Sequence, residues 1–186
     1  RMNLQGLNRE QRKAAETLEG PVLILAGAGS GKTTVIVCRT AYLMQVNNVP
    51  PQRILTLTFG KQSQLDMDRR FAKLFPEMEK PRFSTIHALC LEMLKRYSML
   101  SGREMFALRQ DCTQLVRQLL TEQTGGYVDE DLLQNAQSAL DRICNSMKGA
   151  EQVAKGMDGE FDVVRLHADY TRIKREKRIM DFNDLL

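Results

Sequence analysis

Residues 22–34 read VLILAGAGSGKTT, and this stretch decides the expected fold. Its first four residues are apolar, which is typical of a strand covered on both faces. The glycines that follow let the backbone turn tightly and aim its N–H groups at an anion. A helix that begins at Lys32 would bring its positive end to the same point. The order of strand, loop and helix predicts a site for the phosphates of a nucleoside triphosphate; the alternative is a Gly-rich turn with a chance Lys-Thr pair.

The side chains of this loop divide the expected chemistry between them. Lys32 would reach the β- and γ-phosphates, and the Thr33 hydroxyl would complete the shell of a magnesium ion, so we assign both to catalysis. The strict pattern begins with Gly, whereas this chain has Ala26. The other nucleotide contacts that the pattern predicts are Ala28, Gly29, Ser30, Gly31 and Thr34.

Composition narrows the class of protein. The chain has 186 residues, of which 42% are hydrophobic, enough for one ordinary domain or one and a half. No run of about 18 apolar residues is present, so the sequence predicts no membrane span and no membrane partner. The cysteines are too widely spaced for a Cys-x-x-Cys pair, which indicates reduced thiols in the cytoplasm. They are Cys38, Cys90, Cys112 and Cys144.

The net charge of +4 is unevenly distributed along the chain. Residues 104–169 hold twelve acidic and six basic side chains, whereas residues 1–103 have a basic excess. A basic run follows at residues 172–178. A basic excess suits a polyanionic partner, although solvated faces are the commoner explanation, and we interpret the run at 172–178 as such a face.

Local patterns divide the chain at about the same place. Up to residue 103, helical and extended segments alternate, which builds a parallel sheet through right-handed crossovers. The expected helices cover residues 8–18, 32–46, 62–74 and a segment from 86, and the expected strands cover residues 22–25, 54–59 and 82–85. Further on, apolar stripes predict helices that carry Leu108 to Leu119, Leu132 to Ile143 behind an Asp129 N-cap, and Val163 to Ile173. The sequence therefore predicts an α/β core at 1–103, an all-helical insertion at 104–169 and a return helix at 170–186.

Short motifs occur in the order found in one family. Residues 7–14, LNREQRKA, resemble the Q motif of superfamily 1 helicases of the UvrD/Rep/PcrA type. The loop with Ala26 matches that family's own variant of the phosphate loop. Residues 54–67 resemble motif Ia, residues 85–88 resemble motif Ib, and residues 180–186 are similar to the Asp-Phe-Asp-Asp-Leu stretch shortly before the Walker B strand. The resemblance spans nearly the whole chain, and the order of the motifs is more specific than any one of them.

The resemblance implies a P-loop NTPase core of the RecA-like type, incomplete here, with ATP and Mg²⁺ as cofactors and single-stranded DNA as partner. It also implies ATP-dependent helicase movement from 3′ to 5′. Gln11 would read the adenine edge through its carboxamide, although its spacing from Asn8 equally fits a capping box. Arg39, on the helix after the loop, would contact the nucleotide or else serve as a structural arginine.

The resemblance places DNA contacts at the ends of two expected strands. Phe59 would stack on a base, which is worth about 1–3 kcal/mol per base, unless it is a core residue. Thr85 and His87 would contact the DNA backbone. Residues 60–64 read GKQSQ where the family commonly has Thr-Asn-Lys-Ala-Ala, so we expect Lys61 to supply a phosphate contact from a shifted position.

Hydrolysis also needs a Walker B Asp and a Glu that orients the attacking water. No apolar strand ending in Asp-Glu occurs in the sequence, since the acidic runs at 129–131 and 181–184 follow no expected buried strand. We therefore expect the N-terminal part of a larger motor, unable to unwind DNA by itself, whose second motor domain lies beyond Leu186. A parallel sheet cut short leaves an unpaired edge, which favours self-association.

Three other functions stay open at this point. A helicase–nuclease subunit of the RecB/AddA kind would have similar amino-terminal motifs and would differ by a carboxy-terminal nuclease motif. A small-metabolite kinase with a P-loop would turn over ATP independently of DNA. The 186 residues alone would act as a binding module without catalysis.

Overall fold

The computed structural model describes residues 4, 6–146, 148–157 and 159–186, which fall into two compact units, Arg1–Leu89 and Cys90–Leu186. Helix α4, Ile86–Ser101, crosses the division between them. Each unit has a hydrophobic core of its own. Among the described residues, no helix combines the length and the apolar character that a membrane span requires.

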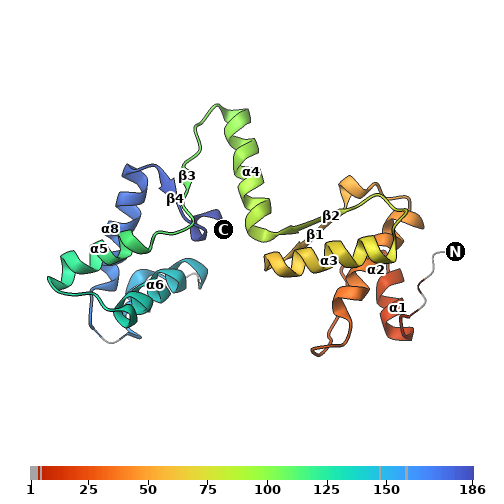
Figure 1. Ribbon diagram of the computed structural model, residues 1–186, viewed down its shortest axis with the longest axis horizontal. Coiled ribbons are helices and arrows are strands. Elements are labelled where there is room, and N and C mark those ends of the chain that lie inside the picture. Colours follow the sequence, from red (N-terminus) through yellow and green to blue (C-terminus); the bar gives the residue numbers. More distant parts are fainter. Residues whose placement is uncertain (1–3, 5, 147, 158) are drawn as a thin grey trace. The chain divides into compact units, whose positions relative to one another are not determined.

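The first unit is built on a parallel pair of strands. Strand β1, Leu55–Thr58, pairs with β2, Arg82–Thr85, so that Leu55 lies beside Arg82 and Thr58 beside Thr85. Helix α3, Lys61–Leu74, makes the crossover between them and lies along the strands (Figure 1). A short 3₁₀ turn, η1 at Pro51–Arg53, leads into β1. The predicted strands at 54–59 and 82–85 and the predicted helix at 62–74 are confirmed to within a residue or two.

Three helices enclose the core of this unit. Helix α2, Lys32–Gln45, and α3 pack their apolar faces together against Phe83 of β2. Helix α1, Arg9–Glu16, packs on α2 through Ala15 and Cys38. The core of α2, α3 and β2 consists of Val37, Ala41, Met67, Phe71 and Phe83. Leu55 and Leu57 of β1 stay more than two-fifths exposed, so helices cover the sheet on one face.

The strand predicted at residues 22–25 is wrong. These residues have no strand conformation, and the side chains of Leu23 and Leu25 are 82% and 85% exposed. A buried strand needs neighbours that accept and donate its backbone hydrogen bonds. In the part of the chain that the structure describes, β1 pairs with β2 and no segment pairs with residues 22–25. The apolar side chains of residues 22–25 therefore do not form a buried strand.

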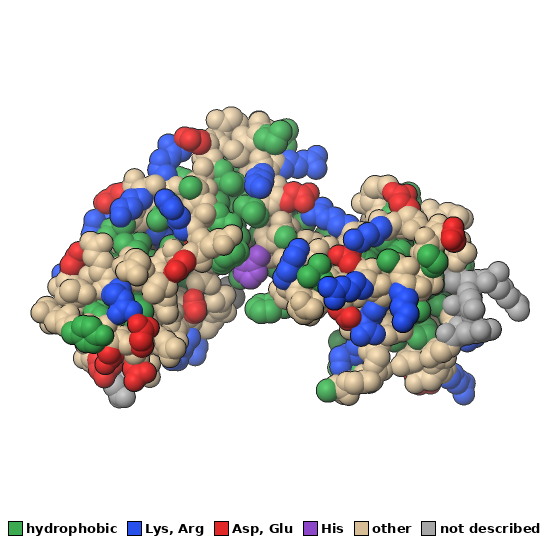
Figure 2. All heavy atoms as spheres, in the orientation of Figure 1, with side chains coloured by type: hydrophobic (Ala, Val, Ile, Leu, Met, Phe, Trp, Pro, Cys, Tyr) green, Lys and Arg blue, Asp and Glu red, His purple; other side chains and the backbone are tan. Residues whose placement is uncertain are grey.

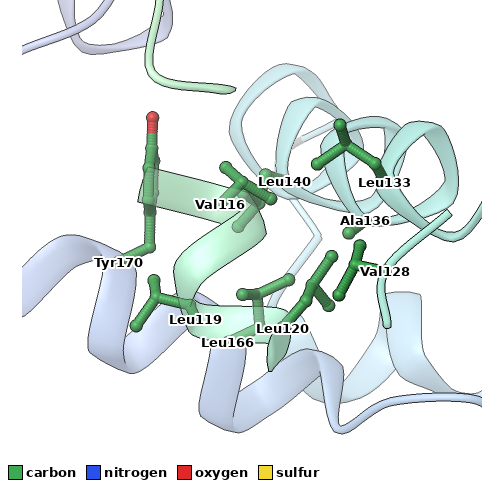
Figure 3. Close-up of a cluster of buried hydrophobic side chains, with 9 residues drawn as sticks. All are labelled: Val116, Leu119, Leu120, Val128, Leu133, Ala136, Leu140, Leu166 and Tyr170. Carbon is green, nitrogen blue, oxygen red and sulfur yellow. The ribbon is translucent and has the colours of Figure 1, made fainter. Parts of the chain in front are cut away.

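The second unit is mainly helical. Its main helices are α5, Thr113–Thr124, α6, Glu130–Asn145, and α8, Val163–Glu176, with the short α7, Ala150–Ala154, between the last two. Asp129 and Asp162 cap α6 and α8 by accepting the amides of Leu132 and Arg165. Figure 3 shows the nine buried side chains of the core, which come from α5, α6, α8 and the segment before α6. The predicted N-cap at Asp129 is confirmed.

Two short strands in this unit were not predicted. Strand β3, Ala107–Leu108, pairs in parallel with β4, Ile179–Met180, and the 3₁₀ turn η2, Asn183–Leu185, follows. Leu108 therefore lies in a strand and not on the predicted helix, which begins at Thr113, and residues 104–169 are not all helical. The mixed helix–strand class with parallel pairing is confirmed. The RecA-like core and the divisions at 103 and 169 stay predictions.

Candidate functional site

The phosphate loop forms a compact turn that ends at the N-terminus of α2. Gly29 and Gly31 have φ values of 74° and 82°, which strain any residue with a Cβ, so both positions favour glycine. Gly31 is the N-cap of α2. The Ser30 amide and hydroxyl both donate to the carbonyl of Gly27, at 3.4 and 2.7 Å. The predicted order of loop and helix is confirmed, although the strand before them is absent.

The Lys32 ammonium lies on the loop itself. Its Nζ donates to the carbonyls of Ala26, at 2.7 Å, and Gly27, at 2.6 Å. A pocket of about 240 Å³ adjoins the lysine and the first turn of α2. Its lining consists of Gly29, Ser30, Gly31, Lys32, Thr33, Thr34 and Arg70. A helix N-terminus with a lysine ammonium beside it suits an anion such as a phosphate. Six of the predicted nucleotide contacts are thus brought together, while Ala28 lies in the loop outside this lining.

Arg70 is a residue of this pocket that the sequence motifs do not reveal. It belongs to α3, where its Nε pairs with Asp66 at 2.7 Å, and its Nη1 lies 3.5 Å from the Thr34 hydroxyl. The packing of α3 on α2 brings this guanidinium to the loop across 36 residues of sequence. An i,i+4 acid–arginine pair is visible in the sequence, but only the packing shows which pocket it faces.

The pocket offers few ligands for a metal. Magnesium in nucleotide sites coordinates mainly phosphate oxygens and water, with one or two protein ligands. Thr33 contributes a hydroxyl to the pocket, while the carboxylate of Asp66 is paired with Arg70. Across the described residues, no three His, Cys, Asp or Glu side chains are grouped as a metal site. The lining therefore fits a magnesium ion that arrives with phosphates and gains one protein hydroxyl.

Gln11 uses both ends of its carboxamide. Its Oε1 accepts the backbone N–H of Asn8 at 2.9 Å. The backbone N–H of Gln11 in turn donates to Asn8 Oδ1 at 2.8 Å, so the capping box is present. Its Nε2 donates to the carbonyl of Ser30 at 2.9 Å. Gln11 therefore takes part in the N-terminal cap of α1 and also contacts the phosphate loop. Its expected contact with adenine stays a prediction.

Arg39 connects α2 to the end of α1. Its Nη1 donates to the carbonyls of Ala14, at 3.0 Å, and Thr17. Carbonyls at a helix C-terminus lack partners within the helix, and a cation there also complements the helix dipole. The guanidinium thus has a structural role, and a contact with nucleotide stays a prediction.

Two rings project where β1 and β2 end. Phe59 follows β1 and is 81% exposed, so it is not a core residue. Its ring meets that of His87 edge to face, with centroids 6.4 Å apart. The parallel pairing of β1 with β2 brings the two rings together, since each comes shortly after the carboxyl end of its strand. Such an open aromatic edge is suited to stacking on a flat ligand.

The two remaining predicted DNA contacts differ in accessibility. The Thr85 side chain is buried, and its hydroxyl accepts the amide of Ala88 at 3.1 Å, which caps the start of α4. Lys61 is exposed at the start of α3, with its Nζ 3.2 Å from the Oε1 of Gln64. In the space-filling view, basic side chains gather where Figure 1 draws α3 (Figure 2). Lys61 therefore lies at the start of α3, two residues after Phe59, whereas Thr85 caps the start of α4, the helix that carries His87.

Residues 7–186, which are nearly the whole chain, match the UvrD/REP helicase N-terminal domain. The chain belongs to this family. Among its relatives, the ATP-dependent DNA helicase Rep of Salmonella typhimurium is 34% identical over 187 residues, which are 97% of this chain and 27% of that protein. PcrA of Bacillus subtilis is 31% identical over 98% of the chain, and UvrD1 of Mycobacterium leprae 30% identical over 98%. The chain spans about a quarter of the length of these relatives.

The second unit of this UvrD/REP domain holds a buried ionic cluster. The Nζ of Lys174 lies 2.9 Å from Asp181 and 2.7 Å from Asp184, and 4.5 Å from the centre of the Tyr170 ring. The Tyr170 hydroxyl donates to Asp181 at 2.7 Å. Lys174 is 6% exposed, so the predicted solvated face at 172–178 is wrong at this position. Asp181 directly follows β4, but its carboxylate is bound to Lys174 and Tyr170.

Opposing effects set the charges in this cluster. Burial lowers the pKa of Lys174, but hydrogen bonds with Asp184 and Asp181 outweigh it, and the pKa is raised. Burial raises the pKa of Asp181, but the hydrogen bonds from Tyr170 and Lys174 outweigh this effect, so the pKa of Asp181 is lowered overall. Burial and the hydrogen bond to Asp181 raise the pKa of Tyr170. Because both carboxylates are paired, the cluster holds β4 and η2 on α8.

Proposed function

We propose that this chain is the ATP-binding and single-stranded-DNA-binding part of an ATP-dependent DNA helicase that moves from 3′ to 5′. The observation that carries the proposal is the pocket at the start of α2, where a lysine, an arginine and a helix N-terminus converge. Family membership supports the same reading, because the named relatives are ATP-dependent DNA helicases. The cytoplasm is the compartment we infer, since the four cysteines are free thiols.

ATP binding would rearrange the loop in a defined way. Lys32 would leave the carbonyls of Ala26 and Gly27 and bind the β- and γ-phosphates. Arg70 and the backbone amides of residues 28–34 would bind the other phosphate oxygens. Thr33 would hold the magnesium ion that comes with the nucleotide, and Gln11 would lie nearest the adenine.

Single-stranded DNA would bind at the ends of β1 and β2. Phe59 would stack on a base, and the ring of His87 would support it from the side. Lys61 would contact a phosphate from the first turn of α3, and Thr85 would act through the backbone of α4. Stacking on an exposed ring is independent of base identity, which suits an enzyme that moves along any sequence.

Unwinding would need parts that these residues do not supply. The acidic side chains nearest to a Walker B pattern, Asp181 and Asp184, are both bound to Lys174. We infer that the chain binds ATP and DNA and that a second motor domain in a longer protein completes the catalytic site. An unpaired edge on the two-stranded sheet would favour self-association of the isolated chain.

The test measures binding of a fluorescent ATP analogue to the 186-residue chain with magnesium present. We expect saturable binding that Lys32→Ala weakens by about ten- to a hundredfold, the value of one charge-assisted hydrogen bond. Lys13→Ala is the matched control, because this exposed lysine lies on α1 outside the pocket. Binding that is absent in the unaltered chain, or equal in both variants, would refute the proposed nucleotide site.

A further inference from the structure

We propose that Gln11 is a positioning residue for the phosphate loop, in addition to any contact with the base. This inference rests on the proposed function, because it concerns how the same site is held in shape. Its central observation is the hydrogen bond of 2.9 Å from Gln11 Nε2 to the carbonyl of Ser30, which joins α1 to the middle of the loop.

The contact is directed at the part of the loop that must keep a strained shape. Ser30 lies between the two glycines with positive φ, Gly29 and Gly31. Its amide and hydroxyl are already turned toward Gly27. Holding the Ser30 carbonyl orients the peptide group that it shares with the Gly31 N–H. That N–H is one of those expected to point at a phosphate.

The space around the contact is narrow. A Cβ placed on Gly31 would lie 3.0 Å from Gln11 Nε2, so the carboxamide packs directly on this glycine. Glycine at this position therefore serves two needs, the positive φ and the close approach of Gln11. An adenine contact alone would not require the carboxamide to lie against the loop backbone.

Helix α1 is fixed well enough to act as a support. At its beginning, the capping box holds Gln11 through Oε1, which leaves Nε2 to point at the loop. At its end, Arg39 of α2 binds the carbonyls of Ala14 and Thr17. Ala15, within this second segment, is buried in one cluster with Cys38 of α2. Helix α1 is thus attached to α2, and the hydrogen bond from Gln11 fixes the Ser30 carbonyl relative to both helices.

The two roles of Gln11 differ in which ligands they affect. A residue that only reads adenine changes the affinity for ATP and leaves the affinity for inorganic tripolyphosphate unchanged. A residue that positions the loop changes both affinities by the same factor. Tripolyphosphate is therefore the informative probe, since it has the phosphates of ATP without the base.

The experiment compares ATP and tripolyphosphate binding by calorimetry in the 186-residue chain and in Gln11→Met, which has a similar length and no donor. We expect both affinities to fall by the same factor, about three- to tenfold for one neutral hydrogen bond. Asn8→Ala is the matched control, because it removes a cap bond from the same helix and leaves Gln11 Nε2 in place. We expect it to lower the melting temperature without changing either affinity.

Each other outcome overturns the inference. If Gln11→Met weakens ATP alone, the residue reads the base and does not position the loop. If Asn8→Ala weakens tripolyphosphate equally, the effect comes from a loosened helix. If the unaltered chain binds neither ATP nor tripolyphosphate, the proposed nucleotide site itself is refuted. This outcome is distinct from the first two, in which the chain binds nucleotide but Gln11 does not position the loop. If Gln11→Met does not fold, Gln11→Glu is the second variant, because it keeps the acceptor for the Asn8 backbone N–H and removes the Nε2 donor. Its loss of tripolyphosphate affinity must persist at high salt, where the repulsion between the new carboxylate and the phosphates is screened.

Discussion

The rings of Phe59 and His87 meet at an interplanar angle of 73°, each just beyond the end of a strand in the same parallel pair. The Phe59 side chain keeps 81% of its surface exposed beside the histidine ring, so most of it is accessible to a ligand. An exposed aromatic ring at a strand end offers a base a flat apolar surface on which to stack.

Replacing Phe59 by alanine is expected to weaken binding of single-stranded DNA by about five- to a hundredfold, the range of one base–aromatic stack. Fluorescence anisotropy with a labelled oligothymidine measures this change. Phe59→Tyr keeps the ring and should bind as the unaltered chain does. Tyr127→Ala is the control, because this aromatic residue is 90% exposed in the other unit. Equal loss in both alanine variants would contradict a stacking site at Phe59.

Arg39→Ala should lower the free energy of unfolding by about 1–3 kcal/mol, because the carbonyls at the end of α1 lose a charged donor. Urea unfolding measures the change, with Arg12→Ala, an exposed arginine on α1, as the control. The same variants should bind the ATP analogue equally well. A variant of Arg39 that is stable but no longer binds ATP would instead assign this residue to the nucleotide.

Lys174→Met should destabilise the second unit by about 2–4 kcal/mol, because it leaves Asp181 buried without its cation. The lower part of this range applies if Asp184, whose side chain is 36% exposed, rehydrates. Thermal unfolding followed by circular dichroism measures the change. Lys177→Met, an exposed lysine three residues later, should have little effect. A stability unchanged in both variants would show that the ion pairs contribute nothing.

Stability should also depend on pH through His167, which adjoins the pocket that holds Lys174. Burial, and then the charge of Lys174, lower the pKa of His167 below 6.5 in the folded state. The unfolded chain then binds the proton more tightly, so stability is complete above the unfolded pKa and falls as the pH drops through and below it. Melting temperatures at about pH 7.5 and about pH 5.5 should therefore differ more for the unaltered chain than for His167→Gln. Equal differences would contradict this linkage.

Local features of the sequence predict local features of the structure. The spacing of Asn8 and Gln11 predicts the capping box, and Asp129 predicts the start of α6, because these contacts span three residues. Where a feature depends on residues within one turn of helix, the pattern contains enough information.

The errors arise where the deciding partner is distant in sequence. Residues 22–25 have the composition of a buried strand but lack a strand to pair with in the described chain. Leu108 fits a helical stripe, yet its backbone pairs with Met180, more than seventy residues later. The sequence alone places Lys174 in a solvated basic run, but Asp181 and Asp184 pair with it in the structure. Arg70 reaches the phosphate loop through the packing of α3 on α2, which no local pattern encodes.

The hydrogen bonds of Lys32 with Ala26 and Gly27 affect how nucleotide affinities should be read. A ligand that captures the ammonium also releases two carbonyls, which must find water or the ligand as new partners. The measured affinity is therefore an exchange energy, smaller than the lysine–phosphate attraction alone. An alanine at this position loses the attraction but also escapes the cost of breaking the contacts inside the loop. The comparison between the two chains gives a lower bound on what the lysine contributes once the nucleotide is bound.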